Sequence, residues 1–352
     1  NLMMHSRATK GEDIPLELEE FIPSTWQTLF LVVPVLSTTF ASVGSMLKDF
    51  GFNSLGWLFV DEAGQATPQA AVGAIMRSKR VLMVGDPLQI EPVVSLSNKL
   101  IRSICLEFKV DPDMWAAPLA SAQSCADRAS CYGTVFKKEE GDLWVGFPLL
   151  VHRRCEDPMF RISNEVAYGN LMIQATPPRS SRIRTLIGDS KWFHLSGTVQ
   201  DKWCPEEGEL IVNFLSLLSS NGVYDPNIYI ITPFRDIAYQ MKLRILQEKA
   251  FFQKIQKEPR LWVAERVGTI HTFQGKEAEA VFMVLGTQDK AQMGARSWAG
   301  SRPNLLNVAV TRAKSAFYVV GNHSLWSDCG SFSILNKSLL VEDVQKEKSL
   351  AS

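Results

Sequence analysis

Short runs of apolar and β-branched residues recur along the first part of the chain, and polar or turn-forming residues follow them. Such runs at 29–35, 57–60 and 81–84 predict buried strands. The segment 68–76 predicts a helix with proline in its first turn. Strand, helix and strand in alternation, with polar residues at the strand ends, indicate the α/β class and a parallel sheet.

The same alternation returns in the second part of the chain. Apolar runs at 227–231, 267–270, 280–285 and 316–320 predict four more strands, with helical spacing at 236–253. Between the two parts, 116–131 predicts a helix and 137–142 a charged linker containing glycine. We therefore expect a first domain over 1–142, a second over 143–335, and a polar tail over 336–352 that frays from about residue 341.

The size and the charge of the chain fit this division. Its 352 residues are enough for two domains, and 46% hydrophobic and 21% charged residues are typical of a globular protein. Lysine and arginine (37) balance aspartate and glutamate (37), so net charge does not favour nucleic acid as a partner. A local basic groove remains compatible with this balance.

Six cysteines at 105, 125, 131, 155, 204 and 329 are spread singly, and none forms a Cys-x-x-Cys pair. This spacing gives no support to a zinc site and suits a reducing, cytoplasmic compartment. No apolar stretch reaches the ~18 residues of a membrane span, so we expect no membrane partner. The first residues, Asn1-Leu2-Met3, show neither an initiator methionine nor a signal peptide, which indicates the interior of a longer protein.

Two polar turns follow neighbouring predicted strands. Asp61-Glu62 follows the run at 57–60, and Gly85-Asp86-Pro87-Leu88-Gln89 follows the run at 81–84. Paired carboxylates at a strand end can place Mg²⁺ and polarise an attacking water, and a glutamine amide can sense a γ-phosphate. The alternatives are a solvated Asp-Glu pair and a Gly-Asp-Pro loop without a further role.

Two arginines of the second part are candidates for stabilising a transferring phosphoryl group. Arg153 lies in Val-His-Arg-Arg (151–154), and Arg312 lies in Asn-Val-Ala-Val-Thr-Arg-Ala-Lys (307–314). A guanidinium fork can neutralise charge that develops on phosphate oxygens. For either arginine alone, a solvated surface charge is the competing interpretation.

The order of these segments resembles a known family. Asp-Glu-Ala-Gly-Gln (61–65), Val-Gly-Asp-Pro-Leu-Gln (84–89), His-Arg-Arg (152–154), Thr-Ile-His-Thr-Phe-Gln-Gly-Lys-Glu (269–277) and Val-Ala-Val-Thr-Arg-Ala-Lys (308–314) occur in sequence. They resemble motifs II to VI of superfamily 1 helicases, within the 5′-to-3′ branch of the nonsense-mediated-decay translocase, senataxin and the Okazaki-fragment nuclease-helicase. The resemblance spans roughly residues 29 to 325 and implies two RecA-like domains.

The resemblance also implies roles for single residues. Asp61 would lie beside Mg²⁺, Glu62 would activate water, and Gln89 would contact the γ-phosphate of ATP. Arg153 and Arg312 would be arginine fingers. Glu277 would hydrogen-bond the ribose, with Gly275 allowing close backbone approach, and Gly85 and Asp86 would complete the turn at the nucleotide.

Single-stranded nucleic acid, DNA or RNA, is the partner that the family implies. The residues expected along its path are Ser37, Thr38, Thr232, Pro233, Phe234, Arg235, Thr269 and His271. Hydroxyls and backbone amides can hold phosphates, and rings can stack on bases. The alternative is structural, because threonines after strands also cap helices and His271 can pack inside the fold.

The sequence departs from the family in two places. His152 stands where the family often has an aromatic residue before the motif IV arginine. Moreover, Gly-x-x-x-x-Gly-Lys-Ser/Thr, the loop that binds β- and γ-phosphates, occurs nowhere in the 352 residues. We therefore expect an incomplete first sheet whose open edge is covered by a missing N-terminal segment or a partner chain.

The lost loop also affects the expected activity. The leading hypothesis is a fragment of an ATP-dependent helicase or translocase that is inactive alone, while its full-length parent hydrolyses ATP. A degenerate helicase fold that binds nucleic acid or protein without hydrolysis is the alternative. An unrelated metabolic P-loop kinase does not explain the paired arginines.

Overall fold

The computed structural model describes residues 21–137 and 141–345. By its internal contacts the chain divides into two compact units, which we treat separately. Within the described range, unit 1 holds 21–87, 91–134 and 144–147, and unit 2 holds 88–90, most of 135–143, and 148–345. The predicted domain division after residue 142 stays a prediction. The expectations for the chain's first residues and for 346–352 lie outside the described residues.

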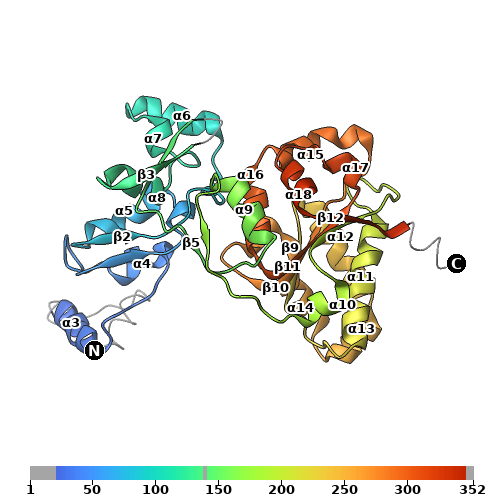
Figure 1. The fold of residues 1–352 in the computed structure, drawn as a ribbon. Helices are drawn as coiled ribbons and strands as arrows, with labels where there is room; N and C mark the ends of the chain where they lie inside the picture. The colour runs from blue at the N-terminus through green and yellow to red at the C-terminus, as the bar shows by residue number, and fades with distance from the viewer. Residues whose placement is uncertain (1–20, 138–140, 346–352) are drawn as a thin grey trace. The chain divides into compact units, whose positions relative to one another are not determined.

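Unit 1 contains a parallel pair of strands, β1 (Leu58–Val60) and β2 (Val81–Met83), with Phe59 opposite Leu82. Helix α5 (Pro68–Met76) connects them, with Pro68 in its first turn, where a missing backbone N–H costs nothing. Strand, helix and parallel strand were all predicted, and all three are confirmed (Figure 1).

The predicted strand over 29–35 is wrong. Helix α3 runs over Ile22–Val32, and α4 follows at Phe40–Met46. Trp26, Leu29 and Phe30 are three and four residues apart and lie on one helical face, where they pack against Phe50 and the rest of a small core. This helical spacing of apolar residues outweighs the β-branched character of the run, and Leu31 and Val32 are left exposed.

The remaining helices of unit 1 are short. They are α6 (Asn98–Glu107), α7 (Pro112–Trp115) and α8 (Ala122–Ala129). The helix predicted over 116–131 is thus confirmed only for its second half, where a capping box between Ser121 and Ser124 fixes the start of α8. Strands β3 (Gly133–Phe136) and β4 (Leu143–Gly146) pair with each other around the predicted linker at 137–142.

Unit 2 is built on a six-stranded sheet in which every neighbouring pair is parallel. The strand order is β12-β7-β11-β10-β8-β9. The bounds are β7 Lys191–His194, β8 Ile228–Thr232, β9 Val267–Thr269, β10 Ala278–Val284, β11 Ala313–Gly321 and β12 Leu340–Asp343. The four strands predicted in this part correspond to β8 to β11, so the α/β class with parallel sheets is confirmed.

Helices connect and cover these strands (Figure 1). They are α9 (Met159–Ala167), α10 (Arg182–Ile187), α11 (Pro205–Ser220), α12 (Arg235–Leu246), α13 (Lys249–Ile255), α14 (Pro259–Arg266), α15 (Met293–Gly300), α16 (Pro303–Thr311), α17 (His323–Trp326) and α18 (Phe332–Ser338). A separate parallel pair is formed by β5 (Val151–His152) and β6 (Ile173–Gln174). The helix predicted over 236–253 is split between α12 and α13.

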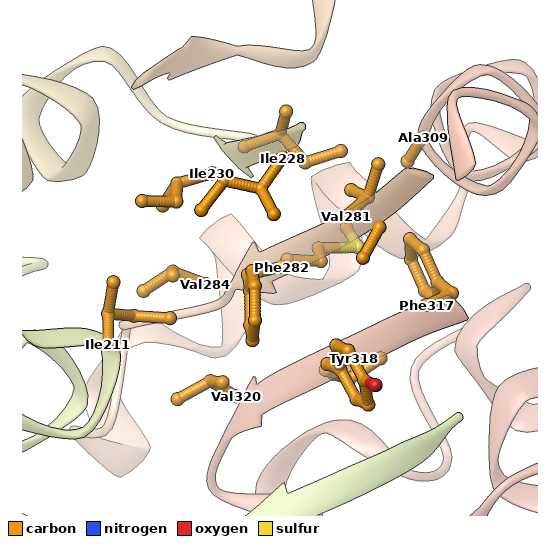
Figure 2. Packing of buried hydrophobic residues seen from close by; sticks show 14 of the residues in the cluster. Ile211, Ile228, Ile230, Val281, Phe282, Val284, Ala309, Phe317, Tyr318 and Val320 are labelled. Atoms are coloured by element: carbon orange, nitrogen blue, oxygen red, sulfur yellow. The ribbon is translucent and has the colours of Figure 1, made fainter. Parts of the chain in front are cut away.

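The core of unit 2 is a sheet buried on both faces. Side chains alternate along β10 and β11, so Val281 and Phe317 share one face while Phe282 and Tyr318 share the other. Figure 2 shows Ala309 of α16 beside the first pair and Ile211 of α11 on the side of the second. Burial on both faces explains why these strands are continuous apolar runs in the sequence.

The expected fraying from about residue 341 is wrong for the part of the tail that the structure describes. Strand β12 adds to the edge of the sheet, parallel to β7, with Val341 opposite Trp192. An ion pair of 2.7 Å between Lys191 Nζ and Glu342 Oε2 joins the same two strands. Charged residues in the segment conceal its role as an edge strand, for which one face open to water is normal.

Candidate functional site

Asp61 and Glu62 form a tight acidic turn at the carboxyl end of β1. Glu62 has a left-handed backbone (φ 54°), and its N–H donates to Asp61 Oδ1 at 3.0 Å. Gln65 Nε2 donates to Glu62 Oε2 at 2.8 Å. A non-glycine residue at positive φ is uncommon, and such strain often accompanies a functional turn. The two carboxylates are therefore held in place by the turn and by Gln65.

The turn after β2 packs backbone to backbone against this acidic turn. Ala63 N–H donates to the Val84 carbonyl at 2.9 Å. A Cβ atom added at Gly85 would lie 2.7 Å from Gly64 N, and one added at Gly64 would lie 2.9 Å from the Asp86 carbonyl oxygen. Only glycine permits this approach at either position. Unit 1 thus brings four predicted site residues together: Asp61, Glu62, Gly85 and Asp86.

Gln89, the predicted γ-phosphate sensor, belongs to unit 2. Its neighbours Leu88 and Ile90 are buried, and Asn307 Nδ2 of α16 donates to the Leu88 carbonyl at 3.2 Å. This anchoring places the Gln89 side chain by the end of α16. Arg312 follows that helix, and its Nη2 lies 3.5 Å from Gln89 Oε1, at the outer limit of a hydrogen bond.

The guanidinium of Arg312 is almost completely buried, with the residue 1% exposed. Its Nε donates to the Val308 carbonyl at 3.1 Å and its Nη1 to the Lys276 carbonyl at 2.9 Å. Arginine stays protonated, so these oxygens offset the desolvation of a permanent positive charge. The guanidinium is therefore held in one orientation, and it lies beside Gln89, a residue predicted to contact the γ-phosphate.

Glu277 lies just before β10, and its carboxylate is shared by two cations. Ala278 stands opposite Ala313 in the β10–β11 register, which sets Glu277 beside Lys314, and Lys314 Nζ donates to Glu277 Oε1. Arg154 Nε lies 3.2 Å from Glu277 Oε2. The hydrogen bond from Lys314 lowers the pKa of Glu277, so the side chain is ionised and purely an acceptor at neutral pH.

More cations than carboxylates gather at this amino-terminal edge of β10 and β11. Glu156 N–H donates to the Lys314 carbonyl at 2.9 Å, and Arg184 Nη1 bonds Glu156 Oε2 at 2.8 Å. Arg179 Nη1 donates to the Arg154 carbonyl at 2.8 Å. The cluster consists of Arg154, Arg179, Arg184, Arg312 and Lys314 against Glu156, Glu277 and Glu279. Such a surplus of positive charge suits a polyphosphate.

His152 occupies the position before the motif IV arginine, and its ring has a structural contact. The backbone N–H of Cys155 donates to His152 Nε2 at 2.9 Å, and the ring lies 5.5 Å from that of Phe160. Burial, together with nearby Arg154, lowers the pKa of His152, which favours the neutral ring that this accepting nitrogen needs. Arg153 beside it is exposed, as is Gly275 with φ 75°.

The residues expected along the nucleic acid differ in exposure. Thr232 and Thr269 are register partners at the ends of β8 and β9, so these two predicted residues do meet. Thr232, Pro233 and Phe234 are buried, whereas Arg235 and His271 are exposed. Ser37 and Thr38 are exposed in unit 1. The Phe234 ring is packed under Lys202 and beside Trp298, so burial limits its direct contact with a base.

Comparison with known proteins places the chain in a family. A family model described as an AAA domain matches residues 149–324, half of the chain, and a second AAA-domain model matches residues 17–97. Proteins named as helicases also match across most of the length of this chain. The chain belongs to the AAA-domain superfamily 1 helicases.

Three curated helicases illustrate the relationship. The DNA replication ATP-dependent helicase/nuclease DNA2 of Saccharomyces cerevisiae is 22% identical over 82% of this chain and 19% of its own length. The RNA helicase Mov10l1 of Homo sapiens is 25% identical over 75% of this chain and 22% of its own length. The ATP-dependent helicase upf1 of Schizosaccharomyces pombe is 23% identical over 88% and 32%. The chain thus spans about a fifth to a third of these relatives.

Among solved structures, a complex of the arterivirus nonstructural protein 10 helicase with DNA aligns with a TM-score of 0.34. The two chains are 14% identical in sequence, and the alignment covers 78% of this chain and 42% of the viral helicase chain.

The sequence prediction missed three residues of this helicase chain that surround Glu277: Arg154, Arg179 and Lys314. The Arg-Arg pair at 153–154 and the lysine two residues after Arg312 are visible in the sequence, but their approach to Glu277 depends on the β10–β11 register. The carboxylates Asp61 and Glu62 belong to unit 1 and the arginines to unit 2, so their joint geometry stays a prediction.

Other kinds of site find no support in the described part of the chain. No group of three or more His, Cys, Asp or Glu side chains there is arranged to hold a metal ion. The six cysteines are free thiols. Each described helix is too short or too polar to cross a bilayer.

Proposed function

We propose that this chain supplies part of the motor of an ATP-dependent helicase or translocase that moves on single-stranded nucleic acid. The supporting observation is the meeting of Gln89 and Arg312 within unit 2. These residues are 223 positions apart, and the family resemblance assigns both to the γ-phosphate of ATP. A buried guanidinium beside a glutamine amide suits a terminal phosphate, because both can contact its oxygens.

The donor set of unit 2 fits a nucleoside triphosphate. Arg312 and exposed Arg153 supply positive charge for the phosphate oxygens, and Gln89 reports the γ-phosphate to the rest of the unit. Glu277 has two carboxylate oxygens, and its side chain keeps 42% exposure despite its bonds to Arg154 and Lys314. Acceptor positions therefore remain for ribose hydroxyls, with Gly275 giving room for the approach.

The donor set of unit 1 fits Mg²⁺ that arrives with the nucleotide. Magnesium in such sites takes one or two protein carboxylates, with phosphate and water oxygens completing the shell. Asp61 would hold the ion, which neutralises charge on the phosphates, and Glu62 would orient and deprotonate the attacking water. Asp86 and Gly85 hold the acidic turn in position, as their contacts with Gly64 indicate.

The 352 residues contain no phosphate-binding loop, which also favours a second candidate, a module that binds nucleic acid or protein without hydrolysis. Arginine fingers raise the rate by ~10³–10⁵ only on phosphates that are already positioned. We therefore expect negligible hydrolysis by the chain alone and robust turnover by the longest product of its reading frame, provided that this product carries the loop.

Phosphate release, measured with and without single-stranded DNA or RNA on both lengths, tests the proposal. Turnover that occurs only with the longer protein and rises when single-stranded DNA or RNA is added supports the proposed helicase or translocase. Robust turnover by the chain alone contradicts the need for the loop. Absence of turnover by a loop-containing product supports the binding module instead.

A further inference from the structure

Trp298 is a partly exposed aromatic residue at the carboxyl edge of β8. It lies on α15 and is 39% exposed. Its ring centroid is 5.9 Å from that of Phe234, the second residue after β8, and the Arg302 guanidinium carbon lies 4.6 Å from its ring centroid. None of the five helicase motifs contains Trp298, Arg302 or Lys202.

Two cations accompany this aromatic pair. Arg302 contacts Trp298, and Lys202 Nζ lies 5.2 Å from the ring centroid of Phe234. Lys202 Nζ forms a long ion pair with Asp236, whose Oδ2 lies 3.7 Å away and whose side chain is 71% exposed. At such exposure an ion pair is weak and readily exchanged for a phosphate. The group thus combines planar surfaces with positive charge, as single-strand binding sites do.

The location of this group is as informative as its composition. Thr232 and Thr269 are opposite each other at the ends of β8 and β9, and they are the residues expected to hold the nucleic-acid backbone. Phe234 is two residues beyond Thr232, but it is only 7% exposed. Trp298 packs against it and is 39% exposed, so the more exposed aromatic residue of the pair belongs to α15.

We propose that Trp298 and Arg302 form a stacking platform for one nucleobase of single-stranded nucleic acid, while Lys202 attracts the adjoining phosphate. This inference rests on the proposed function and adds a base-contacting site outside the helicase motifs. Arg302 lies over the indole in a cation–π contact that preorders the ring. A base can stack on the indole or on the guanidinium plane, since proteins use both surfaces for unstacked bases.

Fluorescence anisotropy with two labelled probes tests the platform: an oligothymidylate of about 12 nucleotides and an abasic strand of equal length. We expect Trp298→Ala to weaken oligothymidylate binding about tenfold, as the loss of one stacked base implies. Trp298→Phe keeps an aromatic face and is expected to recover most of this loss. On the abasic strand, the wild type and both variants are expected to bind alike.

Tyr224→Ala is the matched control, because Tyr224 is 56% exposed and precedes the opposite end of β8. It is expected to leave both affinities unchanged, and thermal unfolding verifies that each variant is folded. Equal oligothymidylate binding by the wild type and Trp298→Ala overturns the platform. So does a loss by Trp298→Ala of the same size on the abasic strand, since that indicates a structural role.

The test separates the platform from the proposed function on which it rests. A wild-type chain that binds neither probe contradicts the nucleic-acid part of the proposed function and removes the platform with it. A wild type that binds both probes, with Trp298→Ala indistinguishable from it, leaves the proposed function standing and refutes the platform alone.

Discussion

Glu207 is a fully buried carboxyl group at the carboxyl ends of β10 and β11. It is 0% exposed, and its oxygens accept hydrogen bonds from Gly286 N–H at 2.8 Å and Gln288 Nε2 at 2.7 Å. Burial raises its pKa from 4.5 to about 8, even though both hydrogen bonds act in the opposite direction. At neutral pH the folded chain therefore holds a proton that the unfolded chain has released.

The sign of the pH effect follows from this difference. Between pH 4.5 and about 8 the folded state binds one proton more than the unfolded state at Glu207. The free energy of unfolding therefore falls as the pH rises through this window. We expect Glu207→Gln, whose side chain stays neutral at every pH, to remove the part of this fall in unfolding free energy that Glu207 causes.

Urea unfolding at a series of pH values measures the effect. The decisive quantity is the difference between Glu207→Gln and the wild type, which we expect to grow in favour of the variant from pH 5 to pH 8. Glu165→Gln, at an exposed position of α9, is the control and is expected to follow the wild type. A difference that does not change with pH would show that Glu207 does not carry a proton in the folded state.

At the scale of residues, the parts of the site that could be predicted are those formed by residues close together in the sequence. Asp61 with Glu62, and Gly85 with Asp86, are adjacent pairs following apolar runs, so their placement at strand ends could be predicted. The cations around Glu277 could not, because Lys314 reaches it through a strand register and Arg154 through a separate segment packed on β11. The exposure of Trp298 likewise depends on the packing of α15.

β12 shows how an edge strand stabilises the sheet. Four of its residues pair with β7, and Glu342 adds an ion pair to Lys191. We expect a chain lacking residues 340–352 to lose roughly 2–4 kcal/mol of unfolding free energy, since several ladder hydrogen bonds at ~0.5–1.5 kcal/mol each are removed. The midpoint of urea unfolding measures the loss.

A chain lacking only residues 346–352 is the control, because it keeps β12 whole. We expect its unfolding midpoint to equal that of the wild type. If the two truncated chains behave alike, β12 does not contribute to stability.

The strands also show what hydrophobic pattern can and cannot predict. β8, β10 and β11 were predicted because burial on both faces makes them continuous apolar runs. β7 and β12 were missed because charged or polar residues such as Lys191, His194 and Glu342 interrupt their apolar pattern. The β-branched residues at 29–35 predict a strand, but the helical spacing of Trp26, Leu29 and Phe30 buries one face of α3 and stabilises a helix.

At the scale of the whole molecule, the residues proposed for phosphoryl transfer are divided between the two units. Fold class and family could be predicted because five motifs recur in a fixed order, which no single residue could indicate. The carboxylates that would hold Mg²⁺ and activate water are in unit 1, and the candidate arginine fingers are in unit 2. If both sets act in one phosphoryl transfer, neither set should accelerate the reaction without the other.

This dependence predicts non-additive losses in a loop-containing product of the gene. Glu62→Gln removes the proposed general base and is expected to lower kcat by ~10²–10⁴-fold. Arg153→Ala removes an exposed residue that we propose as an arginine finger, and it is expected to lower kcat by ~10³-fold or more. Groups that act on the same transition state give combined losses far below the product of the single losses. The double variant should therefore be little slower than the slower single one.

Nucleic-acid-stimulated phosphate release by the four proteins measures this coupling, and Arg161→Ala, an exposed arginine of α9, controls for the loss of surface charge. Binding of a fluorescent ATP analogue separates the chemical step from nucleotide affinity. We expect Glu62→Gln to bind the analogue as the wild type does, because water activation contributes to the transition state and not to ground-state binding. Losses that multiply in the double variant would mean that Glu62 and Arg153 act independently, which a shared active site does not allow.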